Sequence, residues 1–346
     1  LQAGNLREMR NQWTRQNALP EQLVRDKKMA TARCEHAWRG LRAQNDWQSF
    51  VPLLKPVVSL VRQEAQHLSQ TWGISTYEAM LEQYEPGLRI KDLDQSLGSL
   101  QDWLPALIEQ AVKLQTGQRV QMPQGPFAID QQKKLCMQVM KGFGFNFDAG
   151  RLDVSAHPFC GGVPEDVRIT TRFRSDECLS SLYATIHETG HALYEQNLPR
   201  EWLGQPAAQA RSMAIHESQS LFFELQLGRH PAFVQWLAPQ LRATFGAQDA
   251  WEPDNLALWL NRVQPGLIRV DADEVTYPAH ILIRYGIEKA LIEGDIEVED
   301  IPALWDNGME HWLGIDTRGN FKDGPMQDIH WTLGAFGYFP CYTLGA

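Results

Sequence analysis

The stretch SDECLSSLYATIHETGHALYEQN, residues 175–197, is the part of the chain from which the rest is interpreted. Its apolar residues recur at helical spacing, which predicts an amphipathic helix. These residues are Leu179, Leu182, Ile186 and Leu193. Ser175 or Asp176 is expected to cap the first turn, because both side chains can accept a hydrogen bond from a free backbone amide.

The same stretch contains the pattern HETGH. Two histidines four residues apart project from one face of a helix, so His187 and His191 can bind a single tetrahedral zinc ion. Glu188 would lie beside the metal and take a proton from water as the general base. The alternative is a chance match on a buried helix, because the pattern fixes only three positions.

A third ligand is found in MAIHESQSLFFEL, residues 213–225. Glu217 follows in a second helical run that Ala207 and Ala208 are expected to open. Antiparallel packing of the two helices would complete two imidazoles, one carboxylate and an open position, the layout of a catalytic zinc site. Glu224 is the competing candidate, and its alternative role is a solvated helix carboxylate.

Composition limits the class of protein. The 346 residues are 43% hydrophobic and 10% aromatic, enough to bury a large core. The formal charge of −10, with no basic block, argues against nucleic acid or an anionic membrane as partner. We expect one continuous body, with a helical scaffold part at 1–142 and a catalytic part at 143–346 that carries all motifs.

Five cysteines form an odd set without a Cys-x-x-Cys pair, which favours reduced thiols in a cytoplasmic protein. No apolar run approaches the length of a membrane span, and no signal peptide is recognised. The chain begins at Leu1 without methionine, so an upstream segment is expected to be missing.

Helical periodicity dominates the remaining sequence and predicts a mainly helical, all-α fold with a small β-sheet. The expected helices cover 19–44, 47–68, 90–114, 129–140, 254–267, 277–293 and 301–313. Between 143 and 173, glycines and alternating runs such as RITTRF (168–173) predict a small β-ribbon. The ribbon could hold an extended peptide by main-chain pairing, or could only pack beside the site.

Two later segments are dense in titratable and aromatic side chains. IRVDADEVTYPAH (268–280) carries Arg269, Asp271, Asp273, Glu274, Tyr277 and His280. GPMQDIHWTLGAFGYFPCYTLGA (324–346) carries Gln327, Asp328, His330, Tyr338 and Tyr342. Such clusters are unusual for pure scaffold, although the glycine-rich tail suits a tight buried turn as well as the wall of a site.

Six motifs in one order are more specific than HETGH alone, and together they closely resemble the carboxypeptidase Taq family of metallocarboxypeptidases. The motifs are HPF (157–159), DVRIT (166–170), HETGH (187–191), HESQ (216–219), IRVDADEVTY (268–277) and GPMQDIHW (324–331). The resemblance implies a helical body with a cleft, like those of neurolysin and angiotensin-converting enzyme, and a small sheet beside the cleft. It also implies a homodimer that removes C-terminal residues from peptides with broad specificity.

The resemblance also assigns roles to individual residues. His187, His191 and Glu217 look like the ligands of Zn²⁺, with Co²⁺ as the alternative metal, and Glu188 looks like the general base. Arg269 looks like the residue that receives the terminal carboxylate of the substrate. The alternative for Arg269 is a structural ion pair with an acidic neighbour, namely Asp271, Asp273 or Glu274.

The remaining candidates are less specific. Donors that could stabilise the oxyanion are His280, His330, Tyr338 and Tyr342. Further candidates for substrate binding are His157, Tyr277 and Tyr338. The similarity runs from about Leu19 to Leu344, and family members continue on both sides, so the chain is expected to be truncated at both ends.

Three classes of function follow from these residues. The first is a zinc carboxypeptidase, and the second is a zinc oligopeptidase of the same architecture that cuts internally. The third is an inactive helical scaffold that keeps the motif without metal. The first two share every ligand, so only the position of cleavage separates them.

Overall fold

The computed structural model describes residues 1–155 and 158–346. The chain packs into two compact units. The first comprises Leu1–Leu114 and Val263–Thr343, and the second comprises Gln115–Arg262 with Leu344–Ala346. The sequence predicted a scaffold part (1–142) and a catalytic part (143–346) from the positions of the motifs. The two units are defined by packing, so the division by function stays a prediction.

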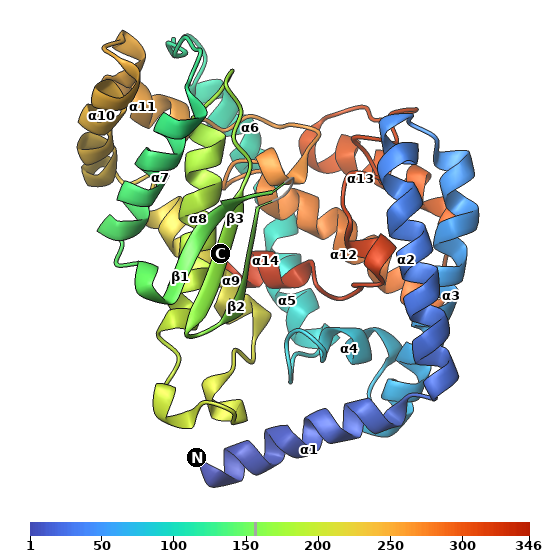
Figure 1. Ribbon diagram of the computed structural model, residues 1–346. Coiled ribbons are helices and arrows are strands. Elements are labelled where there is room, and N and C mark those ends of the chain that lie inside the picture. Colours follow the sequence, from blue (N-terminus) through green and yellow to red (C-terminus); the bar gives the residue numbers. More distant parts are fainter. Residues whose placement is uncertain (156–157) are drawn as a thin grey trace. The chain divides into compact units, whose positions relative to one another are not determined.

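The first unit is built from helices (Figure 1). They are α1 (Gln2–Ala18), α2 (Glu21–Ala43), α3 (Trp47–Trp72), α4 (Thr76–Leu81), α5 (Ile90–Gln101), α6 (Leu104–Leu114), α12 (Tyr277–Glu293), α13 (Ile301–Leu313) and the start of α14 (Pro340–Gly345). Short 3-10 turns lie at Arg269–Asp271, Val298–Asp300 and His330–Leu333.

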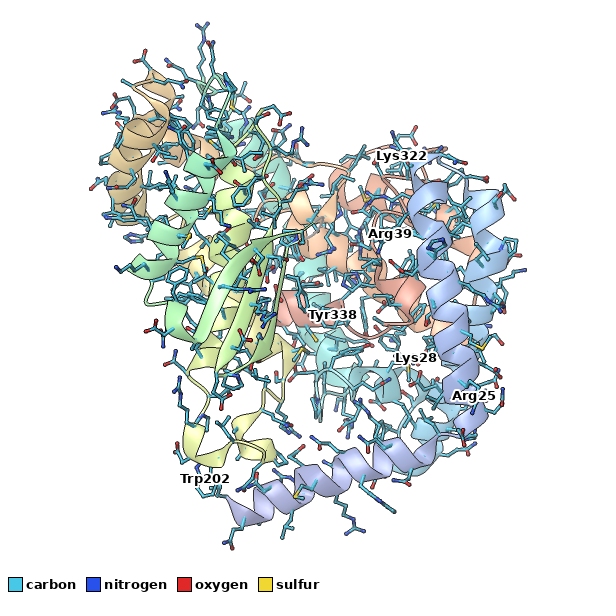
Figure 2. All side chains as sticks on the ribbon, viewed as in Figure 1. Arg25, Lys28, Arg39, Trp202, Lys322 and Tyr338 are labelled. Carbon is cyan, nitrogen blue, oxygen red and sulfur yellow. The ribbon has the colours of Figure 1, made fainter. Side chains whose placement is uncertain are left out.

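Helices α2 and α3 pack side by side along much of their length. In α2, Arg25 and Arg39 lie on the solvent side (Figure 2), whereas Cys34 and Trp38 are buried. The Trp38 indole donates a hydrogen bond to the carbonyl of Met326. The amphipathic pattern of α2 therefore positions a helix that also holds the C-terminal segment of this unit.

Helix α12 departs from the usual amphipathic pattern, because one of its buried faces is polar. His280, Arg284 and Glu288 follow each other at four-residue steps, and all three have no exposed surface. Buried charges are costly unless they are paired, and the partners of Arg284 and Glu288 come mainly from the C-terminal segment of the same unit. The packing of α12 therefore depends on residues distant in sequence.

The second unit contains a small sheet and several helices, of which α8 packs on the sheet (Figure 1). Its helices are α7 (Ile129–Gly142), α8 (Leu179–Gln196), α9 (Met213–Leu221), α10 (Pro231–Phe245) and α11 (Pro253–Leu260). A π-helix (Phe222–Leu227) continues α9 directly. Short 3-10 turns lie at Phe147–Ala149, Arg200–Trp202, Pro206–Ala208 and Asp249–Trp251.

The sheet has the order β1-β3-β2, formed by β1 (Gly150–Val154), β2 (Phe159–Val163) and β3 (Asp166–Thr171). Strand β3 pairs parallel to β1 and antiparallel to β2, with Leu152 and Cys160 both opposite Ile169. Alternate residues of β3 are buried, and the strand packs on α8. The core between them includes Ile169 of β3, Ile186 of α8 and Leu241 of α10.

The structure confirms the mainly helical fold with a small sheet, and two helices, α12 and α13, have the predicted bounds. Several expected boundaries were wrong. The helix expected at 90–114 is split into α5 and α6, and the one expected at 254–267 ends at Leu260. Helices α1, α4, α10 and α14 were not predicted.

The predicted N-cap of the motif helix was also wrong. Helix α8 begins at Leu179, and neither Ser175 nor Asp176 caps it; instead, Glu177 accepts a hydrogen bond from the backbone amide of Ser180. All five cysteines are free thiols. Among the described residues, no helix combines the length and the apolar character that a bilayer crossing requires.

Candidate metal centre and active site

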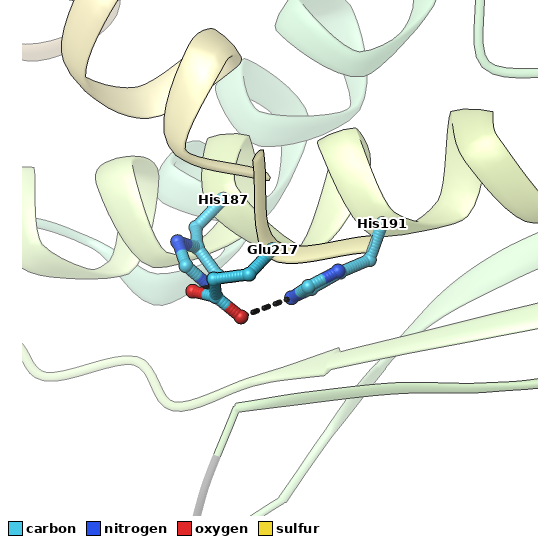
Figure 3. A group of neighbouring side chains, drawn as sticks. All are labelled: His187, His191 and Glu217. Carbon is cyan, nitrogen blue, oxygen red and sulfur yellow. Dashed lines mark ion pairs between the residues drawn. The ribbon is translucent and has the colours of Figure 1, made fainter. Parts of the chain in front are cut away.

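Helix α8 places the two histidines of HETGH on one face, as Figure 3 shows. The opposite face of α8 enters the core through residues such as Leu182 and Ile186. Gly190 lies where α9 crosses α8, and a Cβ at this position would lie 2.5 Å from the carbonyl oxygen of Gln219. The glycine therefore permits a close approach of the second helix.

Helix α9 brings the carboxylate of Glu217 to both histidines (Figure 3). Ser212 caps this helix by accepting a hydrogen bond from the amide of Ile215. One oxygen of Glu217 lies 3.4 Å from Nε2 of His187, and the other lies 3.4 Å from Nε2 of His191. The expected helix start at Ala207 was wrong, since 206–208 is a 3-10 turn and α9 begins at Met213.

The three side chains fit a metal ion in both chemistry and spacing. Their nearest ligand atoms all lie within 4.8 Å of one another. Zinc holds nitrogen and oxygen ligands at about 2.0–2.2 Å in a tetrahedron, so neighbouring ligand atoms are about 3.3–3.6 Å apart. Each histidine lies at this spacing from one of the two oxygens of Glu217. Glu217 is buried, which removes water as a competitor for its oxygens.

Glu188, next to the first histidine, is almost entirely buried. Burial raises the pKa of Glu188 to about 7, and the charges of Glu217 and Glu224 act in the same direction against that of His187. A carboxyl group with a pKa near neutrality can both accept and return a proton. The side chain thus has the titration behaviour that a general base requires.

Further carboxylates contact the histidines on the side away from Glu217. Glu224 lies 2.7 Å from Nδ1 of His187. Nδ1 of His191 lies 2.6 Å from Nδ1 of His216, and Nε2 of His216 lies 2.7 Å from Glu195. From the sequence, Glu224 was predicted to be either a rival metal ligand or a solvated carboxylate. No role was predicted for His216 or Glu195.

The electrostatics of this centre favour a positive charge. Burial alone would lower the pKa of His187, but the charges of Glu217 and Glu224 raise it to about 10. The pKa of His191 is instead lowered by burial, despite its hydrogen bond to Glu217. Four acidic side chains lie around His187, His191 and His216, and a divalent cation would offset part of their negative charge.

In the first unit, the candidates from the two polar segments gather around Asp328. One of its oxygens accepts hydrogen bonds from Nε and Nη2 of Arg269 at 3.1 and 2.9 Å. The other pairs with Arg284, whose Nε lies at 2.7 Å. Burial would raise the pKa of Asp328, but the two guanidinium groups hold it far below its usual range. Two cations therefore share one carboxylate in a buried cluster.

Aromatic and histidine side chains line this cluster. Tyr277 accepts a hydrogen bond from Arg269, and the ring of Tyr342 lies 4.8 Å from its guanidinium carbon. His330 Nε2 lies 3.3 Å from the Tyr342 hydroxyl, and the ring of Tyr338 packs edge-on against that of Tyr342.

His280 is fully buried, and burial together with the charges of Arg284 and Arg269 lowers its pKa to about 3, which keeps the imidazole neutral. His157 lies outside the described residues.

The cluster contains two residues to which sequence reasoning gave no such role. No role was predicted for Arg284, because an arginine in a helical segment is usually exposed to solvent. Asp328 was noted only as part of the tail, whereas the acidic neighbours Asp271 and Asp273 were considered as partners of Arg269. The one available signal was the position of Asp328 inside the GPMQDIHW motif.

The family model of the carboxypeptidase Taq (M32) metallopeptidases matches residues 1–346. The chain belongs to the carboxypeptidase Taq family. Membership of this family makes the chain a metal-dependent carboxypeptidase by class, that is, a hydrolase that acts on peptides.

Relatives within the carboxypeptidase Taq family are similar over nearly the whole chain. Thermostable carboxypeptidase 1 of Thermus thermophilus is 38% identical, with 99% of this chain and 69% of the relative covered. Carboxypeptidase 1 of Bacillus subtilis is 35% identical, with 94% of this chain and 65% of the relative covered. The chain thus spans about two thirds of the length of these relatives.

Solved structures of the family show the same fold. Metallocarboxypeptidase 1 of Trypanosoma cruzi is 46% identical with a TM-score of 0.95, over 99% of this chain and 69% of that one. The carboxypeptidase of Pyrococcus furiosus, in a form described as apo-Mg, is 33% identical with a TM-score of 0.93, over 99% and 69%. The carboxypeptidase Taq family requires a divalent metal, and the described residues include a triad able to hold one.

Proposed function

We propose that the protein is a zinc-dependent carboxypeptidase that hydrolyses the last peptide bond of peptides with broad specificity. The observation that carries the proposal is the spacing of His187, His191 and Glu217, with the buried Glu188 directly beside the first histidine. Two imidazoles and one carboxylate leave a position open, as catalytic zinc sites do. Co²⁺ is the alternative metal, because it accepts the same ligands.

Zinc bound by this triad supplies Lewis acidity, which lowers the pKa of water and polarises a carbonyl group. Glu188 accepts the proton of the attacking water on its carboxylate and later returns it to the leaving amine. Its raised pKa suits both transfers, because neither form is strongly disfavoured near neutral pH. The triad of His187, His191 and Glu217 would hold the metal ion beside the scissile bond. These three side chains exchange no protons with the substrate.

Arg269 is proposed to receive the free terminal carboxylate of the peptide. A guanidinium group matches a carboxylate in shape and charge, and its pairing would position only the final bond for cleavage. The support from the structure is the cluster in which Arg269 and Arg284 share the single carboxylate of Asp328. That arrangement leaves one positive charge more than Asp328 neutralises.

The remaining polar and aromatic candidates are proposed to contact the substrate. His280, His330 and Tyr342 are proposed as donors to the developing oxyanion, and Tyr277, Tyr338 and His157 as substrate-binding groups. The edge of the sheet is proposed to pair with the main chain of the peptide. We also propose a homodimer located in the cytoplasm, with no nucleic-acid or membrane partner.

The first experiment separates the base from the ligands. Glu188→Gln should retain its metal and lose turnover by about 10²–10⁴-fold, because it removes the proton acceptor and no ligand. His187→Ala should lose the metal. Glu165→Gln, on an exposed turn, is the matched control. Turnover close to that of the unmodified chain in Glu188→Gln would remove Glu188 from the mechanism.

The second experiment separates the three classes of function. A peptide with a free C-terminus and the same peptide amidated there are compared, since only an internally cutting oligopeptidase should cleave both at similar rates. An Arg269→Lys variant should lose roughly 30-fold to 1000-fold in kcat/KM on the free acid and little on the amide, about 2–4 kcal/mol for a bidentate contact. Metal analysis that finds no bound ion would identify the inactive scaffold.

A further inference from the structure

We propose that Glu224, and Glu195 acting through His216, are positioning residues that fix the tautomer and orientation of the two metal-binding imidazoles. Glu224 acts directly on His187. Glu195 acts on His191 by way of the His216 ring. The inference rests on the proposed function, since it concerns how the same metal triad is held.

The first contact fixes His187. Its Nε2 faces Glu217 and the metal position, and its Nδ1 lies 2.7 Å from Oε2 of Glu224. A ring nitrogen that binds a cation uses its lone pair, so the proton of the neutral ring must be on the other nitrogen. The carboxylate of Glu224 can only accept, and it therefore selects the Nδ1–H form of His187.

The second contact is a chain of two hydrogen bonds whose direction is fixed at both ends. The carboxylate of Glu195 can only accept, so Nε2 of His216 carries the proton in the 2.7 Å contact between them. Nδ1 of the neutral His216 then has a free lone pair, which accepts from Nδ1–H of His191 at 2.6 Å. A proton on that nitrogen of His216 would instead place two N–H groups against each other. His191 is thereby left with Nε2 for the metal.

The backbone conformation around Glu224 directs its side chain toward His187. Glu217 and Glu224 are seven residues apart, and the helix changes to a π-helix between Phe222 and Leu227. The wider turn presents Glu224 to the far nitrogen of the same imidazole that Glu217 contacts on the near side. Insertions of this kind are frequent at functional sites, because they change the direction of a side chain.

The end of the π-helix is held by the same helix that carries the histidines. Tyr183, one turn before His187 on α8, donates a hydrogen bond of 2.6 Å to the carbonyl of Gly228. A Cβ on Gly228 would lie 2.7 Å from the carbonyl oxygen of Glu224 and 3.2 Å from the Tyr183 ring. Glu224 thus has a defined place relative to His187, unlike a solvated helix carboxylate.

Metal affinity tests the Glu224 arm. Competition against a zinc chelator should show a loss of about 10-fold to 100-fold in Glu224→Ala, the usual effect of removing such a partner. Glu224→Gln should recover much of that loss, because its amide oxygen still accepts from Nδ1–H. Glu165→Ala is the matched control. The visible spectrum of the Co²⁺-loaded proteins should change in Glu224→Ala and not in the control.

Equal zinc affinity in the parent and in Glu224→Ala, both folded by circular dichroism, would overturn the Glu224 arm. If the parent chain binds no zinc at all, the proposed function fails and the Glu224 arm fails with it, whereas the Glu195 arm is decided by the next measurement.

Histidine tautomers test the Glu195 arm. Two-bond ¹H–¹⁵N correlation spectra of histidine-labelled protein should show His216 as the Nε2–H tautomer without metal, and His191 as the Nδ1–H tautomer once zinc is bound to its Nε2. Glu195→Ala should leave His216 as a mixture of tautomers and weaken zinc binding less than Glu224→Ala does, because it acts through one more ring. An Nδ1–H tautomer of His216 in the unmodified chain would overturn the proposed chain.

Discussion

A Cβ on Gly190 would lie 2.6 Å from the Cα of Ser220, so α8 and α9 meet backbone to backbone at this crossing. Side-chain carbons do not approach another backbone so closely. Gly190, the fourth residue of HETGH, is therefore required for the close approach that brings Glu217 to the histidines. It takes no direct part in catalysis, because it has no side chain.

Gly190→Ala should separate the two helices and disturb the metal triad. We expect a loss of about 1–3 kcal/mol in the free energy of unfolding, as for other overpacked sites, together with weaker zinc binding. Urea unfolding and chelator competition measure the two effects. Gly286→Ala is the control, since nothing surrounds that helical position and alanine should stabilise it slightly. Equal behaviour of the two variants would contradict the close crossing.

Asp328→Asn should destabilise the protein strongly. Removing one member of a buried ion pair costs about 3–5 kcal/mol, because the remaining charge stays buried, and here both Arg269 and Arg284 lose their partner. Thermal and urea unfolding measure the change. Asp316→Asn breaks an exposed pair with Arg318, which solvent screens, and should leave the stability almost unchanged. A similar small cost for Asp328→Asn would show that the cluster is solvated.

Glu288 should make the stability of the protein fall as the pH rises. Burial raises the pKa of Glu288 to about 7, despite the hydrogen bonds that it accepts from Trp331, Tyr77 and the Gly337 amide. The folded state therefore binds the proton more tightly than the unfolded state, whose pKa is 4.5. The contribution is fully present below pH 4.5 and is lost as the pH rises through 7, by about 3 kcal/mol in total.

The measurement is the difference in unfolding free energy between the parent chain and Glu288→Gln from pH 5 to pH 8. All other titrating groups are common to both proteins, and the depressed pKa of Asp328 confines its own effect to strongly acidic solution. The advantage of the parent over Glu288→Gln should shrink from pH 5 to about pH 7 and then level off. A difference independent of pH would mean that Glu288 does not titrate there.

Metal removal should lower the thermal stability of the unmodified chain. Zinc at about 100 times its Kd should raise the unfolding free energy by about 2.7 kcal/mol, because only the folded state assembles the triad. Calorimetry with added zinc and then with excess chelator measures the gain and its reversal. His191→Ala should not respond, whereas His67→Ala, on α3, should behave like the parent. A response of His191→Ala equal to that of the parent would place the zinc elsewhere.

Local chemistry explains which parts of the fold the sequence could predict. The bounds of α12 and α13 were confirmed because each has a proline in its first turn, and because Gly294 and Gly314 adopt the left-handed conformation that ends a helix. The start of α9 was misplaced because two alanines favour a helix, while the actual cap is Ser212, five residues before Glu217.

The outer parts of the site could not be predicted, because they depend on contacts between distant residues. A π-helix differs from an α-helix by one step in its hydrogen bonds, and its apolar and polar residues follow no distinct pattern. The sequence therefore left Glu224 as a rival ligand or a solvated carboxylate. Its contact with His187 depends on how α8 packs beside it. Asp328 lies 59 residues after Arg269, and nothing in the spacing of the two marks them as partners.

The polar face of α12 limits when this helix can be buried during protein synthesis. Arg284 and Glu288 leave the ribosome 43–49 residues before Asp328, Trp331 and Gly337, which supply most of the acceptors and donors that these two side chains need. Until that last segment has emerged, burial of α12 would leave charges without partners, so the helix must stay hydrated or at the surface. The first unit can therefore complete its folding only after synthesis of its final residues, and truncation before Gly337 should produce a protein recognised by chaperones as unfinished.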